Sequence, residues 1–439
     1  DGSLLARDGS ALAAGATDEF QLNSYTSSTQ NWPEIAALPD GGWIAVWYGN
    51  SATDSAGITA RRFDAAGNPV EPDGSPLVGT GEWQVNSAYT SYSQADPKVA
   101  ALLGVNAGKF VITWESQHED GSDYAVTTQI YNADGTPDGA SFFANSTLTA
   151  EQSNPEITAL SDGGFFISWH SFNSTDGLGL DTGDGERYGV FAQRFDASGA
   201  AMGSELQINS FTADDQTYPS VTELSNGNIV VVWTDDTKDL YGQGIFATVI
   251  APDGSEIVPE FRVNDQTING QYDPHVAALD TGGFVIVYTD ANGTDGSSEG
   301  VYAQQYSASG GRVDSQFLVN SETSSTQFQP SITALADGGF AIAWTSYTSG
   351  TAGDGNSYGV FYQTYANATP LALNVDFSGD EDTIITLDAA SFEASFSDPD
   401  GQSLQAIRIE SLPALGTLAL NGAPVVPSQV VTIADLQAG

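Results

Sequence analysis

The stretch "ALSDGGFFISW" (159–169) decides the fold, because nearly the same phrase occurs elsewhere in this chain. It returns as "ALPDGGWIAVW" (37–47) and as "ALADGGFAIAW" (334–344). Asp-Gly between two apolar runs predicts a tight hairpin turn, since glycine readily adopts the positive φ that such turns require. In "FFISW" both alternating faces are apolar, which predicts a strand that is covered on both sides.

The unit around this phrase occurs six times, and recurrence at a regular period indicates a repeat architecture. Each copy has an Asn, a Ser/Thr-rich link, a Gln-x-x-Pro motif, the hairpin and a closing aromatic residue. The Asn residues are Asn23, Asn86, Asn145, Asn209, Asn264 and Asn320, and the closing aromatics are Trp47, Trp114, Trp169, Trp233, Tyr288 and Trp344. The Gln-x-x-Pro motifs begin at Gln30, Gln94, Gln152, Gln216, Gln271 and Gln327.

Three or four strands, buried on both faces and repeated, are typical of a propeller blade that packs between two neighbours. Six copies predict an all-β, six-bladed β-propeller over residues 1–368. The N-terminal "SLLARDGSALAAG" (3–15) is similar to "AQRFDASGAAMGS" (192–204), which suggests that the N-terminal region adds a strand to the last blade and closes the ring.

A different pattern begins near Leu371, where the repeated unit stops. Alternating apolar residues and Pro, Gly or Asn turns predict a small β-sandwich over residues 369–439. A module of about 70 residues is short for a complete sandwich of about 100 residues, so we expect it to be incomplete.

Composition excludes several classes of function. The chain has 56 acidic residues against 11 Lys and Arg, a formal net charge of -45, and no Cys. Such a field repels nucleic acid and anionic membranes, and the lack of Cys excludes thiolate metal sites. No apolar run approaches the length of a membrane span, so we predict no membrane insertion. The natural counter-charge is a cation, and Ca²⁺ suits carboxylate-rich loops.

The C-terminal segment resembles the cadherin-like tandem modules of RTX-type bacterial adhesins. The resemblance is carried by "EDT" (381–383), "DPDG" (398–401) and "GTLALNG" (416–422). "YGVFAQRFDASG" (188–199) resembles repeats of the same large proteins. The resemblance to these adhesins implies a cadherin-like, Ig-like fold for the C-terminal module and an extracellular or cell-surface location. No glycine-rich Ca²⁺-coil nonapeptide is present in the chain.

Candidate calcium ligands fall into two groups. The resemblance implies that four acidic residues of the C-terminal module bind interdomain Ca²⁺: Glu381, Asp382, Asp398 and Asp400. Two glycine-rich loops place further oxygen ligands close together, and solvated loops without an ion remain the alternative. These loop candidates are Asp176, Asp181 and Asp184 in the first loop, and Asp290, Asn292 and Asp295 in the second.

The sequence shows no recognisable catalytic constellation. His118, His170 and His275 lie in different repeats, and we predict that none is catalytic. The six repeated Gln side chains either line a channel mouth that binds a glycan or bond to the adjacent blade. Repeated positions chiefly serve packing between neighbours, so the second interpretation is favoured. Residues that break the repeat are expected to form any site.

These observations predict a non-enzymatic, calcium-dependent adhesion or ligand-binding module of a large bacterial surface protein. Its expected partners are a glycan or protein on a surface, or copies of itself. Two alternatives stay open: a filament or surface-layer subunit completed by strand addition, and a secreted carbohydrate-active enzyme with paired carboxylates at the channel mouth.

Overall fold

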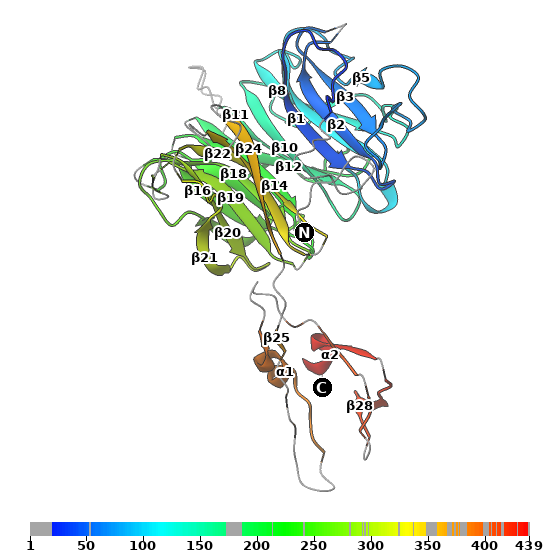
Figure 1. Cartoon of the computed structure of the whole chain (residues 1–439), viewed down its shortest axis with the longest axis vertical. Helices are drawn as coiled ribbons and strands as arrows, with labels where there is room; N and C mark the ends of the chain where they lie inside the picture. Colours follow the sequence, from blue (N-terminus) through cyan, green and yellow to red (C-terminus); the bar gives the residue numbers. More distant parts are fainter. Residues whose placement is uncertain are drawn as a thin grey trace.

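A computed structural model describes the residues 20–51, 54–172, 187–212, 214–239, 242–280, 282–291, 293, 296, 298–323, 325–336, 338–347, 358–366, 371–372, 375, 377, 384–397, 404, 406–409, 411–413, 417–427 and 429–437. Six antiparallel sheets follow one another along the chain, and each has a Gln-x-x-Pro strand as its innermost member (Figure 1). The predicted six-bladed, all-β propeller is confirmed.

Each blade runs from its inner strand outward in chain order. Blades 1 and 2 are β1 (Gln30–Ala37), β2 (Trp43–Gly49), β3 (Gly57–Phe63), β4 (Pro69–Val70) and β5 (Glu82–Gln84), then β6 (Gln94–Ala101), β7 (Phe110–Gln117), β8 (Tyr124–Tyr131) and β9 (Phe142–Phe143). Blades 3 and 4 are β10 (Gln152–Ala159), β11 (Phe165–Phe172), β12 (Tyr188–Phe195) and β13 (Leu206–Gln207), then β14 (Gln216–Glu223), β15 (Ile229–Asp235), β16 (Gly244–Ile250) and β17 (Glu256–Arg262). Blades 5 and 6 are β18 (Gln271–Ala278), β19 (Phe284–Asp290), β20 (Gly300–Tyr306) and β21 (Arg312–Leu318), then β22 (Gln327–Ala334), β23 (Phe340–Tyr347) and β24 (Tyr358–Tyr365). A short 3₁₀ helix, η1 (Gly104–Asn106), lies in the hairpin of blade 2.

The recurring Asp-Gly-Gly phrase forms the hairpin tip, and its two glycines have different roles. Gly163 has a φ of 91° and donates its N–H to the Leu160 carbonyl at 2.9 Å. A Cβ on Gly164 would lie 2.4 Å from the carbonyl oxygen of Phe195, so a side chain there would collide with the third strand. The Asp162 carboxylate accepts the Gly164 N–H at 2.9 Å and closes the turn. The repeated phrase therefore records a turn that approaches the neighbouring strand closely.

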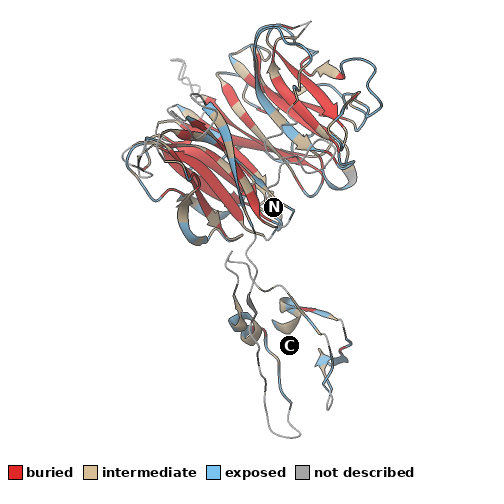
Figure 2. Ribbon diagram, viewed as in Figure 1, coloured by how far each residue is buried: buried red, intermediate tan, exposed pale blue. Residues whose placement is uncertain are grey.

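The closing aromatic residues are buried between blades, as predicted. All six are at most 7% exposed, and Trp169 and Trp233 are fully buried. Figure 2 shows the buried residues concentrated in the strands of the propeller. Trp169 packs with Val111 and Val126 of blade 2, while Trp233 packs with Phe166 of blade 3. Each of the five interfaces between consecutive blades is therefore an apolar layer that contains a closing aromatic side chain, whereas Trp47 packs with Ala45 and Phe63 of its own blade.

The repeated Asn and Gln join consecutive blades through a buried hydrogen-bond relay. The Asn Nδ2 group donates to the Gln Oε1 of the next blade in all six repeats, at 2.7 to 3.1 Å. In blades 1 to 5 the same Asn accepts, through Oδ1, a backbone N–H near the start of the third strand, at 2.8 to 2.9 Å; the donors are Ile58, Val126, Val190, Ile245 and Val301. The scaffold interpretation of the repeated Gln is thus the correct one.

Blade 6 differs from the others in the part of the chain that the structure describes. Its sheet has three strands there, and β24 exposes Val360 (81%) and Tyr362 (51%). On blade 1, Ile35 is 65% exposed, whereas the matching Val221 of blade 4 is buried. The facing sides of the first and last blades are therefore more exposed than the interfaces within the series.

The C-terminal part contains short elements (Figure 1, orange to red). These are β25 (Leu371–Ala372), α1 (Ala389–Ser395), β26 (Phe396–Ser397), β27 (Ala406–Arg408), β28 (Ala419–Leu420), β29 (Ala423–Pro424), β30 (Val430–Thr432) and α2 (Ile433–Gln437). The pairs are β25 with β26, β27 with β30 and β28 with β29, so the complete sandwich stays a prediction.

Helix α1 was not predicted from the sequence. The Asp388 side chain accepts the Ser391 N–H at 2.8 Å, which caps the helix, and the apolar alternation of this stretch concealed that signal. Among the described helices, none has the length and apolarity to cross a membrane.

Removing an interface aromatic tests this packing. Trp169→Ala should lower the free energy of unfolding by about 3 to 5 kcal/mol, because the cavity cannot fully collapse between two sheets. Urea unfolding followed by circular dichroism measures the change. Val78→Ala is the control, since Val78 is 93% exposed and its loss should cost less than about 0.5 kcal/mol. Equal, small effects for both variants would contradict the packing argument.

Candidate functional site

Every inner strand has a bulge at its Gln-x-x-Pro motif, and the residue before the proline is displaced there from the regular ladder. That residue has a positive φ, between 43° and 57°, in all six blades. We call this set the mouth ring: Trp32, Asp96, Asn154, Tyr218, Asp273 and Gln329. Positive φ is unfavourable for residues other than glycine and concentrates at functional sites. The ring is therefore a candidate site, with a different side chain from each blade.

The residue after the proline forms a second set, which we call the inner ring: Glu34, Lys98, Glu156, Ser220, His275 and Ser331. Lys98 is the residue of this ring around which the acidic side chains gather. Its Nζ is 3.1 Å from Glu156 Oε1, 3.2 Å from Glu34 Oε1 and 3.5 Å from Asp96 Oδ1. One ammonium group thus joins carboxylates from blades 1, 2 and 3.

Burial and charge oppose each other at Lys98. Burial lowers the pKa of Lys98, but Glu156, Asp96 and Glu34 outweigh it and hold the pKa well above its ordinary value. Burial raises the pKa of both Glu34 and Glu156 despite the attraction of Lys98. One ammonium group is therefore shared among three acidic side chains, two of which burial makes harder to ionise.

Glu115 adds a carboxyl group whose protonation state suits acid catalysis. It follows Trp114 on β7, and its Oε1 accepts the backbone N–H of Asn154 at 2.7 Å. Burial, reinforced by the charge of Asp96, raises the pKa of Glu115 to about 7, against the lowering effect of the Asn154 N–H. Near neutral pH a substantial fraction of Glu115 therefore carries a proton beside an ion-paired Asp96.

His170 occupies the matching position on β11 and is held neutral. Its Nδ1 accepts the Tyr218 N–H at 3.3 Å, so Nε2 carries the proton and donates to Ser153 Oγ at 2.9 Å. Burial lowers the pKa of His170 to about 3. Ser153 Oγ in turn donates to Glu151 at 2.9 Å. A histidine that donates to the serine cannot accept its proton, so this cluster is no nucleophilic triad.

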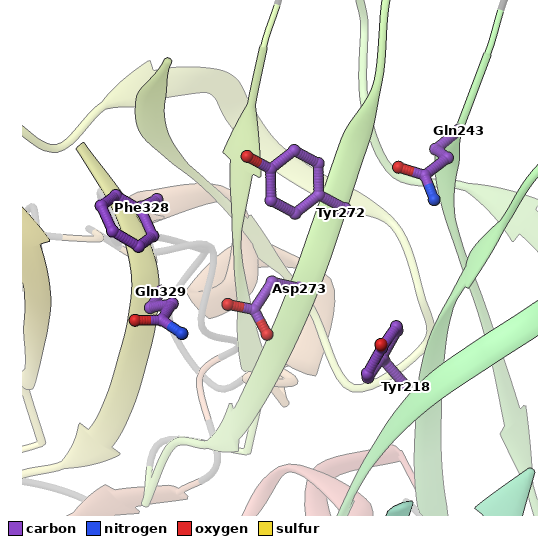
Figure 3. A pocket seen from close by; sticks show the side chains of 6 residues that line it. All are labelled: Tyr218, Gln243, Tyr272, Asp273, Phe328 and Gln329. Carbon is purple, nitrogen blue, oxygen red and sulfur yellow. The ribbon is translucent and has the colours of Figure 1, made fainter. Parts of the chain in front are cut away.

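A pocket of about 350 Å³ lies at the mouth ring on the side of blades 4, 5 and 6 (Figure 3). Tyr218, Asp273 and Gln329 of the mouth ring form one row, and Phe328, Tyr272 and Gln243 form a second row beside it. The Tyr272 hydroxyl donates to Glu299 at 2.5 Å, which fixes its ring at the pocket wall. The site therefore has an acidic half on blades 1 to 3 and an aromatic half on blades 4 to 6.

Most predicted calcium ligands lie outside the described residues. This holds for Glu381, Asp382, Asp398, Asp400, Asp176, Asp181, Asp184, Asn292 and Asp295. Asp290 is described: it is buried at the end of β19 and accepts the Gln271 side-chain N–H at 3.4 Å. That position belongs to the relay between blades, so the structure gives Asp290 a scaffold contact. Calcium dependence stays a prediction.

One acidic group of the described residues has carboxylate oxygens within 4.8 Å of one another: Asp214, Asp215 and Asp236. Arg187 lies 3.0 Å from Asp214 and 3.3 Å from Asp215. A guanidinium thus already balances part of this charge, and the group carries no metal assignment.

Sequence reasoning missed the mouth ring, Glu115 and the channel position of His275. His275 was predicted to have no catalytic role, and the structure places it in the inner ring, 3.9 Å from Asp273. The signal was present, because the residue before each repeated proline changes from copy to copy while its neighbours repeat. The expectation that sites break the repeat was applied to the long loops and not to this position.

Comparison with known proteins agrees with the fold. No protein-family model matches the chain, and no curated protein matches its sequence. A protein of unknown function from Dyadobacter fermentans is similar over 76% of this chain and 95% of its own, with a TM-score of 0.51 and 8% identity. An α-L-arabinanase from Penicillium chrysogenum is similar over 77% of this chain and 94% of its own, with a TM-score of 0.48 and 13% identity. A GH93 α-L-arabinofuranosidase from Fusarium graminearum, solved with arabinobiose, is similar over 76% of this chain and 92% of its own, with a TM-score of 0.45 and 10% identity.

These findings correct the predicted function. The prediction of a non-enzymatic adhesion module is wrong, because similar solved structures include an arabinanase and an arabinofuranosidase. No family model supports the resemblance to RTX-adhesin repeats or cadherin-like modules. At these identities the similarity shows the fold, and the chemistry has to be argued from the residues of this chain.

The buried neutral His170 makes a stability prediction with a definite sign. Its folded pKa, about 3, lies below its ordinary value of 6.5, so the unfolded chain binds more protons between these values. The stabilisation is present above pH 6.5 and is lost as the pH falls toward 3. His170→Gln should therefore flatten the dependence of Tm on pH in this window. An unchanged slope would contradict the neutral assignment, and His118→Gln, at an exposed turn, is the control.

Proposed function

We propose that the chain is a glycan-active enzyme that hydrolyses glycosidic bonds at the mouth ring. The observation that carries this proposal is the pairing of Glu115, whose pKa is about 7, with the ion-paired Asp96 beside it. Glycoside hydrolysis uses two carboxyl groups, of which one carries a proton that it gives to the leaving oxygen. The alternative of a secreted carbohydrate-active enzyme is therefore favoured.

The roles follow from the environment of each group. Glu115 is the general acid: it protonates the glycosidic oxygen as the bond to the anomeric carbon breaks. Asp96 faces the developing oxocarbenium ion and acts either on the attacking water or directly on the anomeric carbon. The configuration of the released sugar, measured by NMR, distinguishes these two courses. Lys98 is a positioning residue, because its contacts to Asp96, Glu34 and Glu156 hold the carboxylates together.

The aromatic half supplies the binding surface. Sugars present apolar C–H faces and polar edges, and a pocket with a few polar groups among aromatic rings matches both. Tyr272 and Phe328 offer ring faces, while Asp273, Gln329 and Gln243 offer hydrogen-bonding groups. The acidic surroundings disfavour uronates and sulfated sugars, so the proposed substrate is a neutral glycan. An arabinofuranosidase of similar fold was solved with arabinobiose, which places arabinan among the first substrates to test.

Replacing the proposed acid tests the mechanism. Glu115→Gln keeps an acceptor for the Asn154 N–H but removes the proton, so kcat should fall by about 10² to 10⁴. In the wild type, kcat/KM should decline as the pH rises through about 7, where Glu115 loses its proton. Sugar release from a panel of neutral polysaccharides measures both effects.

The matched control is Glu223→Gln. Glu223 ends the inner strand of blade 4 at the opposite end from the mouth ring, and it also accepts a backbone N–H, that of Ser161, at 2.6 Å. This variant should keep wild-type activity. Equal activities of Glu115→Gln and the wild type would sink the assignment of the acid, and no sugar release from any neutral glycan would sink the enzyme itself.

The binding half can be tested separately from the acid. Tyr272→Ala and Phe328→Ala should raise KM about tenfold or more with a smaller change in kcat, because each removes contact surface remote from the bond that breaks. Ile257→Ala, on the outer strand of blade 4 and 49% exposed, is the control for loss of an apolar side chain. A pure loss of kcat with unchanged KM would place the sugar elsewhere.

A further inference from the structure

Exposed aromatic side chains gather at the mouth end of the propeller. Four Tyr or Trp residues there are at least half exposed: Trp32 (53%), Tyr92 (63%), Tyr218 (50%) and Tyr358 (60%). They belong to blades 1, 2, 4 and 6 and lie in the mouth ring or beside it. Among the described residues of the hairpin end, no Trp, Tyr or Phe is exposed. Apolar rings exposed at one end only mark a binding surface.

Each of these rings is held in place by a second ring. The centroid distances are between 4.9 and 5.8 Å, and three of the four pairs meet nearly edge-on, at 82 to 89°. The pairs are Trp32 with Tyr48, Tyr92 with His118, Tyr218 with His170, and Tyr358 with Phe328. A ring that is already fixed loses little freedom when a ligand covers it.

One group of rings belongs to the acidic half of the mouth. Tyr92 and Asp96 lie in one short segment, on either side of Gln94, where the inner strand of blade 2 begins. Trp32 is the mouth-ring residue of the adjacent blade 1. The proposed function places Asp96 at the anomeric carbon. A sugar chain that passes Asp96 on this side therefore meets Tyr92 and Trp32.

The second group of rings belongs to the aromatic half. Tyr218 and Phe328 line the pocket of blades 4 to 6 (Figure 3), and Tyr358 packs on Phe328. This pocket adjoins the acidic half, because burial and then the charges of Asp273, Glu115 and Asp96 raise the pKa of Tyr218. The two proposed reacting carboxyl groups thus have aromatic rings on both sides.

We infer that the mouth binds an extended stretch of a linear neutral polysaccharide, which is cut inside the chain rather than at its end. Sugars on one side of the bond occupy the pocket, and sugars on the other side stack on Tyr92 and Trp32. Hydrolysis adds the hydroxyl of water to the anomeric carbon and the proton of Glu115 to the leaving oxygen, so both products are shorter chains. The position of the bond rests on the proposed function, whereas the binding surface rests on the exposed rings.

The residues between the rings favour a sugar chain over a protein partner. Along the mouth ring, Trp32 is followed by Asp96 and Asn154, and Tyr218 is followed by Asp273 and Gln329. Rings that alternate with hydrogen-bonding groups match the apolar C–H faces and the polar hydroxyl edges of successive sugars. A sugar chain also brings no charge that the acidic side chains would repel.

Oligosaccharides of graded length test the surface without catalysis. The probes are arabino-, xylo- and manno-oligosaccharides, from the disaccharide to the hexasaccharide, titrated by calorimetry into the Glu115→Gln variant. In at least one series the affinity should rise about tenfold or more with length, because longer chains reach the rings outside the pocket. Equal affinity for the shortest and the longest member of every series would overturn the inference, whatever the activity of the wild type.

Substitutions of the rings outside the pocket locate the added contacts. In the Glu115→Gln background, Trp32→Ala and Tyr92→Ala should each weaken hexasaccharide binding about tenfold and disaccharide binding less. Trp32→Phe and Tyr92→Phe keep a ring and should retain most of the affinity. Met202→Ala is the control, since Met202 is 46% exposed at the opposite end. Unchanged hexasaccharide affinity in both Ala variants, with loss of self-association, would show that a second copy of the chain covers these rings.

The first products of the wild type separate this inference from the proposed function. On the polysaccharide of the panel that it hydrolyses, viscosity should fall while few reducing ends are released, and oligosaccharides of several lengths should appear first. Release of only mono- or disaccharides from the start would contradict internal cleavage and leave the proposed function intact. Length-dependent binding without hydrolysis of any polysaccharide would remove the proposed reaction and support the binding surface.

Discussion

The structure depends on one buried hydrogen-bonding side chain per repeat, the Asn that lies two residues beyond the end of the fourth strand. Its carbonyl oxygen accepts a backbone N–H of its own blade, and its amide N–H donates to the Gln of the next blade. Asn209 is 4% exposed and Gln216 is fully buried, so each unmade bond would leave a buried polar group without compensation. Apolar packing alone tolerates a range of angles between sheets, but this relay fixes the orientation of each blade to the next.

Fixed blade angles determine what the inner strands present. Each bulge displaces the residue before the proline from the ladder, and all six such residues have a positive φ. Glu115 and His170 then reach into the next blade to accept the N–H groups of Asn154 and Tyr218. At Asn154 and Tyr218 the positive φ is thus supported by a side chain of the preceding blade, which is how a strained backbone conformation persists at a site.

The sequence predicted the scaffold well because scaffold positions repeat. The Asn, Gln, Pro, Gly and Trp positions each recur for a local physical reason, and the hairpin, the blade and the number of blades follow from them. The site was harder to predict, because a single copy of Asp96 or Glu115 is indistinguishable from many other acids in a chain with 56 of them. Their importance comes from burial and from neighbours on other blades, which the sequence does not order in space. The position before the proline was the exception. Its residue changes from copy to copy while the surrounding motif repeats, and this could be seen in the sequence.

The displaced position before each proline has a consequence for how such a chain can change. A residue outside the ladder presents its side chain at the mouth while the ladder hydrogen bonds of the inner strand continue on either side of it, and Trp, Asp, Asn, Tyr and Gln are all accommodated there. Substitutions at these six places therefore leave the ladder of each blade intact. The blades thus form a constant scaffold with six variable positions, and new ligand preferences are accessible by combining substitutions at these positions without changing the scaffold.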